Sequence, residues 1–322
     1  MLYIEKGDMQ GFMNIMKERI PIQDTLKYLV QCEYDGLTAQ PESLSNVLAI
    51  VPEQMDRVLR DLESAELVYR DKGMLLLTPS GREYALHVLR AHRLYETYLA
   101  EKAGVSDDRL HAQAEIEEHK LSADDVEKLA RELDHPRYDP HGDPIPTATG
   151  EMPPKRGQPL SDYPAGWEGR VIHIEDEPPA LYAHIYAANI APGTVLRIAE
   201  KGDEKLRVQT EGCSYHFPTD VASQITVVPL EQDEAFDESL QRLSSLVQGE
   251  EASVVGLSPL CRGLERNRLL DLGVVPGSSI SVDMVSPSGS PIAYRIRGAS
   301  IALRRQQSDL VLIRKTEDEA NG

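Results

Sequence analysis

Two imidazoles and two carboxylates lie close together in the segment "HAQAEIEEH" at residues 111–119. Their spacing is i, i+4, i+7 and i+8, so on a helix of roughly 3.6 residues per turn all four fall within about a quarter-turn. The four residues are His111, Glu115, Glu118 and His119. Imidazole and carboxylate groups both bind divalent cations. The stripe therefore predicts one half of a metal site, and the competing interpretation is an ordinary solvated acidic helix face.

A second pair of the same kind occurs one predicted helix earlier. In "HRLYE", His92 and Glu96 are spaced i, i+4 and share a helix face. Two antiparallel helices with these faces opposed would bring six donor groups together. A donor set without thiolate suits Mn(II), Fe(II), Co(II) or Zn(II). Six donors are enough for one or two ions per protomer.

Composition favours a cation-binding protein of a reducing compartment. The three cysteines, Cys32, Cys213 and Cys261, form no CxxC pair, which argues for the cytoplasm and against a disulfide framework or a thiolate zinc site. The segment "MLYIEKGDMQGF" lacks the regions of a signal peptide, and no apolar run approaches the roughly 18–20 residues of a membrane span, so no membrane insertion is expected. The formal charge of −19 suits cations but opposes nucleic-acid binding.

The elements before the two His/Glu pairs predict a small DNA-binding domain. Residues 1–21 form a short amphipathic lead-in helix by pattern. Residues 22–66 then show helical periodicity in three pieces, the last opening with Pro52. Alternation around "DKG" at 71–73 predicts a β-hairpin. Three helices followed by a hairpin indicate a winged helix-turn-helix over residues 22–80.

The rest of the chain divides into a helical part and two β-rich parts. Residues 81–146 are helical, with Ser122 and Asp125 resembling a capping box, and the Pro/Gly-rich stretch 147–166 is a linker. "IAPGTVLRI" at 190–198 reappears as "VVPGSSISV" at 274–282, so two small barrels are expected. Their ranges are 167–230 and 247–316, joined by an acidic linker helix at 231–246 and followed by a tail at 317–322.

The order of a winged helix, "HRLYE", "HAQAEIEEH", "PHGDPIP" and a small β-barrel resembles the diphtheria-toxin-repressor family of metal-dependent transcriptional regulators. The resemblance covers roughly residues 22–230. It implies a multidomain α+β chain with an N-terminal winged helix-turn-helix, an all-α dimerisation domain and C-terminal SH3-like barrels. It also implies a homodimer that binds double-stranded operator DNA when loaded with Mn(II) or Fe(II).

The same resemblance implies two metal sites. Glu115, Glu118 and His119 match the family's primary site, which Asp24 of the first winged-helix helix would complete; the alternative role for Asp24 is a helix N-cap. Glu and Asp at these positions resemble the manganese-sensing branch. The ancillary site would use groups from both pairs, with two looser candidates from the first barrel. These are His92, Glu96 and His111, with Glu175 and Glu177.

The second barrel resembles a FeoA domain, an SH3-like module associated with ferrous-iron transport, and the first barrel resembles a degenerate copy. The resemblance is carried by "RLLDLGVVPGSSISV", "SPSGSPIAYRIRG" and "IALRR". Such modules bind partners and carry no catalytic group. The basic residues of this barrel indicate a partner surface, with ordinary solvated arginines as the alternative.

Charge in the predicted recognition helix conflicts with DNA binding. The DNA-contacting set is expected to be Pro52, Gln54, Arg57, Arg60, Arg70 and Lys72. In "VPEQMDRVLRD", however, Glu53, Asp56 and Asp61 would repel phosphate. Residues 1–90 hold ten Lys/Arg against fourteen Asp/Glu, a difference of about −4.

The sequence therefore predicts a metal-dependent repressor of metal-ion uptake genes, without enzymatic activity. The alternative is a metal-sensing accessory protein of an iron or manganese transporter, which contacts the transporter through the second barrel and no longer binds DNA. A dinuclear metallohydrolase is the third class; metal-activated water would be available to it, but no separate base or nucleophile pattern supports it.

Overall fold

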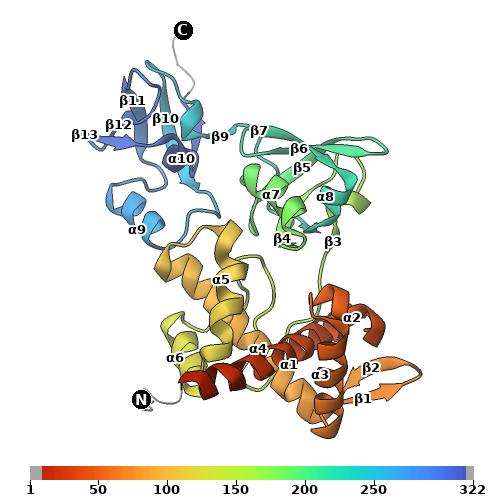
Figure 1. Cartoon of the computed structure of the whole chain (residues 1–322). Coiled ribbons are helices and arrows are strands. Elements are labelled where there is room, and N and C mark those ends of the chain that lie inside the picture. Colours follow the sequence, from red (N-terminus) through yellow and green to blue (C-terminus); the bar gives the residue numbers. More distant parts are fainter. Residues whose placement is uncertain (1–8, 317–322) are drawn as a thin grey trace. The chain divides into compact units, whose positions relative to one another are not determined.

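The computed structural model describes the backbone of residues 9–316 and the side chains of residues 19–316. The described chain forms two compact units. The first comprises the residues up to Tyr98, His111–Asp139 and Asp143–Lys155; the second comprises Leu99–Leu110, Pro140–Gly142 and the chain from Arg156 onward. Figure 1 shows helices dominating the first unit and strands dominating the second. Each unit is described separately below.

The first unit begins with the winged helix-turn-helix expected from the sequence. Its elements are α1 (Met9–Asp35), α2 (Pro41–Val47), α3 (Pro52–Ser64), β1 (Val68–Asp71) and β2 (Met74–Leu77). Apolar residues of all three helices and both strands share one core, with Leu26, Leu44 and Met55 almost completely buried. The hairpin turns through Lys72 and Gly73, both at positive φ, which matches the twist of a two-residue hairpin loop.

The predicted lead-in helix and the first winged-helix helix are one element. α1 runs without a break from Met9 to Asp35 and contains Pro21. The expected boundary after residue 21 was therefore wrong, because a proline removes only one intrahelical hydrogen bond and the helix continues beyond it. Residues 1–8 of the predicted lead-in lie outside the described residues.

Helices complete the first unit. α4 (Pro79–Tyr98) packs along α1, and the chain returns through α5 (Leu110–Glu117), the 3₁₀ turn η3 (Glu118–Lys120) and α6 (Ala123–Glu132). The predicted capping box is present, since Ser122 accepts from the Asp125 backbone N–H and Asp125 accepts from that of Ser122. Ala91 and Leu94 of α4 pack against Val126 and Ala130 of α6 in a small separate core.

The second unit contains two antiparallel sheets with the same strand order. The first is β3-β8-β4-β5-β6-β7 and the second is β9-β14-β10-β11-β12-β13. Strand bounds for the first sheet are β3 (Gln158–Pro159), β4 (Glu168–Ile174), β5 (Val195–Lys201), β6 (Lys205–Thr210), β7 (Cys213–Pro218) and β8 (Ile225–Pro229). For the second they are β9 (Leu240–Arg242), β10 (Glu251–Leu257), β11 (Ser279–Val285), β12 (Ile292–Ile296), β13 (Ala299–Leu303) and β14 (Val311–Lys315). The internal repeat expected from the sequence is thus a repeat of topology.

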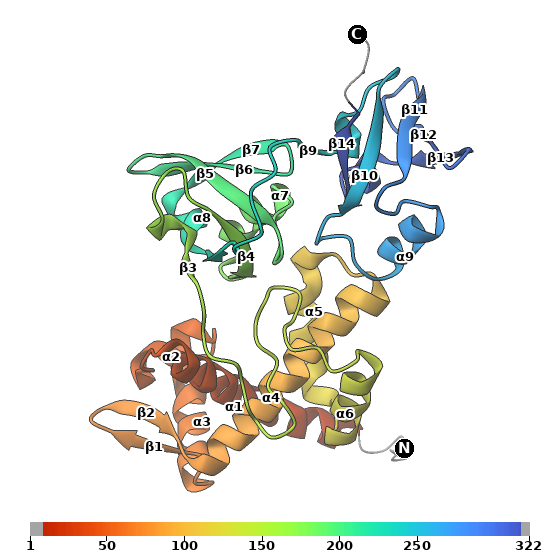
Figure 2. The same cartoon turned by 180° about the vertical axis from the view of Figure 1, so that it is seen from behind.

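Helices follow equivalent strands of the two sheets in chain order, and Figure 2 labels three of them, α7, α8 and α9. α7 (Pro179–Ala187) and α8 (Thr219–Ser223) contribute to the core of the first sheet, and α9 (Gly263–Asp271) with α10 (Arg305–Ser308) follow the equivalent strands of the second. Register shifts also recur, at Val171/His173 and at Val254/Gly256. A short π-helix, η1 (Leu99–Ala103), follows α4. Short 3₁₀ turns are η2 (Asp107–Arg109), η4 (Leu160–Asp162) and η5 (Leu243–Ser245).

The segment predicted to be an acidic linker helix, 231–246, contains no α-helix, and its helical residues are those of the 3₁₀ turn η5. It is a turn-rich loop followed by β9, which pairs with β14. Its carboxylates pair across the fold instead, as Glu234 does with Arg170 and Asp237 with Arg314. The last residues of the predicted linker 147–166 also belong to a domain, because β3 pairs with β8. Both sheets therefore start earlier than the sequence pattern indicated.

Among the described residues, none of the helices combines the length and the apolar character needed to cross a membrane.

Candidate metal centre

Four elements of the first unit supply the predicted ligands. α1 carries Asp24, α4 carries His92 and Glu96, and α5 carries His111 and Glu115. α5 ends at Glu117, so the last two ligands of the motif, Glu118 and His119, lie in the 3₁₀ turn η3. The expectation that residues 111–119 form one helix face was therefore wrong at its C-terminal end. A 3₁₀ turn advances by about 120° per residue, where an α-helix advances by about 100°, so Glu118 and His119 depart from the α-helical positions that the spacing predicts.

Three of the four residues predicted for the primary site come together. Asp24, Glu118 and His119 each offer a ligand atom, and these atoms lie within 4.8 Å of one another. His119 Nε2 is 3.3 Å from Asp24 Oδ1 and 3.6 Å from Glu118 Oε1. The side chains of Glu118 and His119 are 0% and 3% exposed. Two carboxylates and one imidazole converging in a buried site fit a divalent cation of the Mn(II) or Fe(II) type. This group is called the primary centre below.

A neighbouring amide orients the imidazole of the primary centre. The Gln23 side-chain amide lies 2.7 Å from His119 Nδ1, so that Nε2 faces Asp24 and Glu118. A partner on the distal ring nitrogen is the usual arrangement for a histidine that binds metal. Gln23 is itself only 3% exposed, so its position is held by packing.

Glu115, the fourth predicted ligand, is outside this group. Its side chain is 48% exposed, and its Oε1 is 3.3 Å from Lys27 Nζ and 3.6 Å from His111 Nε2. The hydrogen bond from His111, together with the charge of Lys27, lowers the pKa of Glu115 to about 2 although partial burial opposes the shift. Glu115 is therefore a carboxylate that lies beside the primary centre and outside its ligand cluster.

The side chains predicted for the ancillary site also come together. His92, Glu96 and His111 place ligand atoms within 4.8 Å of one another. Glu96 Oε1 is 3.1 Å from His92 Nε2 and 3.3 Å from His111 Nδ1. The two imidazole rings meet edge to face with centroids 4.9 Å apart. This group is called the ancillary centre below.

Glu118 and His92 join the two centres. His92 Nδ1 contacts Glu118 Oε2, while its Nε2 faces Glu96. Burial raises the pKa of Glu118, but the charges of His92 and Lys27 outweigh it, so the pKa is lower than usual and Glu118 is a carboxylate. Burial lowers the pKa of His92, but Glu96 and Glu118 outweigh it and raise the pKa above its ordinary value. The imidazole thus lies between two anionic groups.

Lys27 is the residue at this site that the sequence analysis missed. Its Nζ is 2.9 Å from Glu118 Oε1 and 3.3 Å from Glu115 Oε1, and its side chain is 14% exposed. Burial lowers the pKa of Lys27, but Glu118 and Glu115 raise it by more, so the ammonium form is favoured. Its position three residues after Asp24 on α1 was the available signal, because residues i and i+3 share a helix face.

Two buried arginines of α4, also not singled out beforehand, hold the loop that follows α6. Arg93 donates to Pro144 O at 2.6 Å and to Asp143 Oδ1 at 2.9 Å, and it donates to Gln31 of α1 at 2.8 Å. Arg90 donates to Pro146 O at 2.7 Å. These contacts connect the "DPIP" part of the loop to the helices that carry the ligands.

Glu175 and Glu177, the two looser ancillary candidates, follow β4 in the second unit, and both are exposed. The backbone N–H of Glu175 donates to Gln224 O at 2.9 Å. Their part in metal binding stays a prediction.

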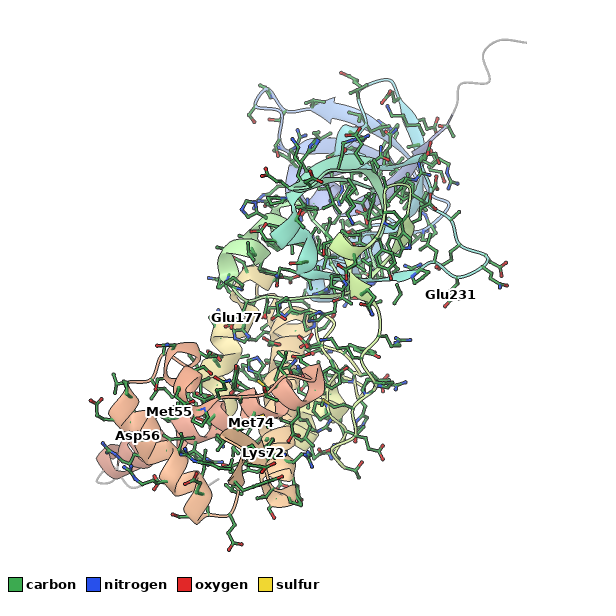
Figure 3. All side chains as sticks on the ribbon, turned by 90° about the vertical axis from the view of Figure 1, so that its right-hand side faces the viewer. Met55, Asp56, Lys72, Met74, Glu177 and Glu231 are labelled. Carbon is green, nitrogen blue, oxygen red and sulfur yellow. The ribbon has the colours of Figure 1, made fainter. Side chains whose placement is uncertain are left out.

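The predicted DNA-contacting residues lie on α3 and the hairpin. Pro52 begins α3, Gln54 is half-buried, and Arg57 and Arg60 are exposed. Lys72 is exposed at the hairpin turn, and Figure 3 labels both this residue and Asp56 of α3. Arg70 is also exposed, but its Nε is 2.6 Å from Glu63 Oε1. An arginine paired in this way is a weaker phosphate contact than the other three cations.

Two protein-family models match the chain. The model described as "Iron dependent repressor, metal binding and dimerisation domain" matches residues 78–147, which include both centres except their α1 ligand. The FeoA domain model matches residues 158–229 and 241–315, one match for each sheet. The two matches reproduce the topological repeat, including its start before the strand β10.

Curated relatives of the chain include iron-dependent repressors and diphtheria toxin repressors. The iron-dependent repressor IdeR of Mycobacterium tuberculosis is 40% identical over 72 residues, which are 22% of this chain and 31% of that protein. The diphtheria toxin repressor of Corynebacterium glutamicum is 26% identical over 160 residues, 47% of this chain and 70% of that protein. The chain thus spans about a third of the length of the first of these relatives.

Solved structures extend the likeness to the winged helix. A manganese-dependent transcriptional repressor in complex with manganese aligns with a TM-score of 0.60 and 29% identity, covering 65% of this chain and 100% of that one. The structure of the Thermoplasma protein titled "T. acidophilum IdeR" aligns with a TM-score of 0.54 and 25% identity, covering 64% of this chain. These relatives and neighbours are metal-dependent transcriptional repressors.

Proposed function

The chain is a member of the diphtheria-toxin-repressor family with C-terminal FeoA domains, and we propose that it is a homodimeric, metal-dependent repressor of metal-uptake genes. In this proposal Mn(II) or Fe(II) is the activating ion and operator DNA is the macromolecular ligand. The function needs no catalytic group, and none is assigned. The dimer is supported by the match of residues 78–147 to a dimerisation domain.

The proposal rests on one observation: the ligands of the primary centre come from two different parts of the chain. Asp24 belongs to α1 of the winged helix, whereas Glu118 and His119 belong to η3 of the helical domain. When bound, a divalent ion would neutralise the converging carboxylates and link the two parts. Without that positive charge, Asp24 and Glu118 repel each other. Ion binding therefore stabilises one position of α1, and with it one position of α3 on which DNA contact depends.

The donor set supports manganese and ferrous ions. The primary centre offers two carboxylates and an imidazole with no thiolate or thioether among them, and harder oxygen donors suit Mn(II) and Fe(II). The printed names of the relatives include both an iron-dependent and a manganese-dependent repressor. Asp24, Glu118 and His119 are the proposed primary ligands, and Glu115 is proposed as a flexible fourth.

The proposed DNA surface is the N-terminal part of α3 together with the hairpin. Arg57, Arg60 and Lys72 would contact phosphates, and Gln54 would face the base edges. This surface also carries exposed carboxylates, so phosphate contacts are few. We therefore expect weak binding by the metal-free chain and a strong dependence on the metal that sets the spacing of two α3 helices in the dimer.

Fluorescence anisotropy with duplexes upstream of the chain's own gene and of metal-uptake genes tests the proposal. We expect Mn(II) or anaerobic Fe(II) to increase affinity by at least about tenfold over a chelator control. His119→Ala should remove the metal response. Glu117→Gln is the matched control, because Glu117 is the neighbouring carboxylate but pairs with Lys120 at 2.6 Å on the surface. Metal uptake and dimerisation without metal-dependent, sequence-specific DNA binding would refute the repressor.

A metal-sensing accessory protein of a transporter is the second candidate. It is favoured by the exposed Glu53, Asp56 and Asp61 of α3, which repel phosphate, and by the presence of two FeoA domains. Direct binding of a purified iron or manganese transporter through residues 247–315, in a chain without any DNA footprint, would favour this role over the repressor.

A further inference from the structure

An ammonium group of the chain itself lies between two carboxylates of the metal site. Lys27 Nζ is 2.9 Å from Glu118 Oε1 and 3.3 Å from Glu115 Oε1. The Glu118 side chain is 0% exposed and that of Lys27 is 14% exposed, so water screens the contact to Glu118 only weakly. An exposed lysine-carboxylate pair is an ordinary surface contact of little energetic weight, whereas this ammonium is mostly buried and contacts a fully buried ligand of the primary centre.

We propose that Lys27 fills a second cation position of the primary centre, so that this centre takes one divalent ion where its carboxylates would otherwise take two. The inference rests on the proposed function, because it requires that Asp24, Glu118 and His119 bind a divalent ion. It concerns the number of ions and not the identity of the metal.

The groups around Lys27 Nζ are those of a metal position. Glu115 and Glu118 each direct a carboxylate oxygen at it. The second oxygen of Glu118 contacts His92 Nδ1, so an imidazole nitrogen borders the same region. In two-metal sites the ions lie about 3.5–4 Å apart and act together on shared groups. Glu118, placed between the primary centre and Glu115, is positioned to be such a shared ligand.

Charge balance gives the physical reason for a single ion. Asp24, Glu115 and Glu118 contribute three negative charges, and Lys27 with one divalent ion contributes three positive charges. Without Lys27, one divalent ion leaves a net charge of −1 among these three carboxylates, which attracts a further cation. With Lys27 present, a second divalent ion would add two positive charges next to the ammonium at a site already neutral.

The ancillary centre is separate from this position. Its donors meet on the far side of the His92 ring, where Nε2 is 3.1 Å from Glu96 Oε1. Lys27 makes its ion pairs with Glu115 and Glu118. An ion count at the primary centre therefore requires a chain whose ancillary centre is disabled, and Glu96→Gln does this without altering a contact of Lys27.

The experiment counts Mn(II) per protomer by equilibrium dialysis in three full-length chains that all carry Glu96→Gln. We expect one ion in the Glu96→Gln parent, two after Lys27→Gln, and one after the charge-conserving Lys27→Arg. Low-temperature electron paramagnetic resonance gives a second readout, since two adjacent Mn(II) ions couple magnetically and one does not. Lys27→Met, which keeps the apolar stem, replaces Lys27→Gln if the latter does not fold by circular dichroism.

The outcomes separate this inference from the proposed function. One ion in both the Lys27→Gln and Lys27→Met chains, or two ions in the parent, would overturn the role of Lys27 while leaving metal sensing intact. A parent that takes up no Mn(II) or Fe(II) at the primary centre would overturn the proposed function, and the inference with it.

Discussion

At the scale of single residues, Glu115 and Glu118 show how three positions along the chain separate two carboxylates into different environments. The Glu118 side chain is 0% exposed and contacts Lys27, His92 and His119, whereas that of Glu115 is 48% exposed. Glu115 lies in α5, which ends at Glu117, whereas Glu118 begins the 3₁₀ turn after it. Glu118 is therefore the ligand on which both centres depend, and Glu115 is the one that can move.

The depressed pKa of Glu115, about 2, predicts a pH-dependent contribution to the stability of the metal-free chain. Because the folded pKa lies below the ordinary value near 4.5, this contribution is present above about pH 4.5 and is lost as the pH falls toward 2. Glu115→Gln should thus lower the free energy of unfolding at pH 6 by under about 1 kcal/mol, since solvent screens a half-exposed group. At pH 3 the difference should be smaller.

Urea unfolding at the two pH values, with a chelator present, measures this difference. Glu117→Gln is the comparison variant, because Glu117 forms an exposed pair with Lys120, whose charged atoms are 2.6 Å apart. An effect of Glu115→Gln that is as large at pH 3 as at pH 6 would contradict the assignment.

At the scale of elements, α4 organises the first unit because it carries both ligands and structural arginines. His92 and Glu96 face α5, while Arg90 and Arg93 hold the backbone carbonyls of Pro146 and Pro144. A helix with this many buried polar groups is stable only where each finds a partner. The loop after α6 supplies several of those partners, so the loop and the metal site are parts of one packing arrangement.

Replacing Arg93 therefore tests whether α4 stabilises the first unit through its contacts with this loop. Arg93→Met should lower the free energy of unfolding by about 3 kcal/mol, because it removes the buried guanidinium that donates to Asp143 and to the Pro144 carbonyl. Arg82→Met, on the same helix, is the matched control: Arg82 is 49% exposed and pairs with Glu33, so its loss should cost about 0.5 kcal/mol or less. Chemical denaturation of both variants gives the comparison. An equal loss of unfolding free energy in the two variants would contradict a structural role for Arg93.

At the scale of the whole molecule, a chain of net charge −19 that binds DNA must do so through few cations. Arg57, Arg60 and Lys72 are exposed on α3 and the hairpin, which amounts to six cations in a dimer. Each phosphate contact contributes about −0.9 to the slope of log affinity against log salt concentration, so six contacts predict a slope of about −5.

The salt slope gives a test at this scale. Arg60→Gln removes one contact per protomer and should make the slope less steep by about 2, whereas Arg131→Gln, an exposed arginine on α6, should not change it. Anisotropy titrations between about 50 and 200 mM salt measure both. An unchanged slope for Arg60→Gln would show that α3 does not contact phosphate as proposed.

Much of this architecture was predictable from the sequence because its signals are local. Several predicted features depend only on spacing along the chain, and each is present. They are the three helices and the "DKG" hairpin of the winged helix, the Ser122 capping box, and the repeat of "APGT" by "VPGS". The predicted acidic linker helix failed for the same reason, since its carboxylates form long-range pairs and its residues 240–242 form β9, which pairs with β14. The pattern of neighbouring residues predicts neither the long-range ion pairs nor the strand pairing.

By itself, the sequence determined which donors are available: imidazoles and carboxylates at helical spacing, without thiolates, and a carboxylate on the first winged-helix helix. Only the tertiary structure decided which of them share a centre. Asp24 meets Glu118 and His119, Glu115 is left to Lys27 and His111, and His92 bridges the two groups. The physical reason is that these contacts join residues far apart in the sequence, as Asp24 and His119 are, and depend on how α5 passes into its 3₁₀ turn.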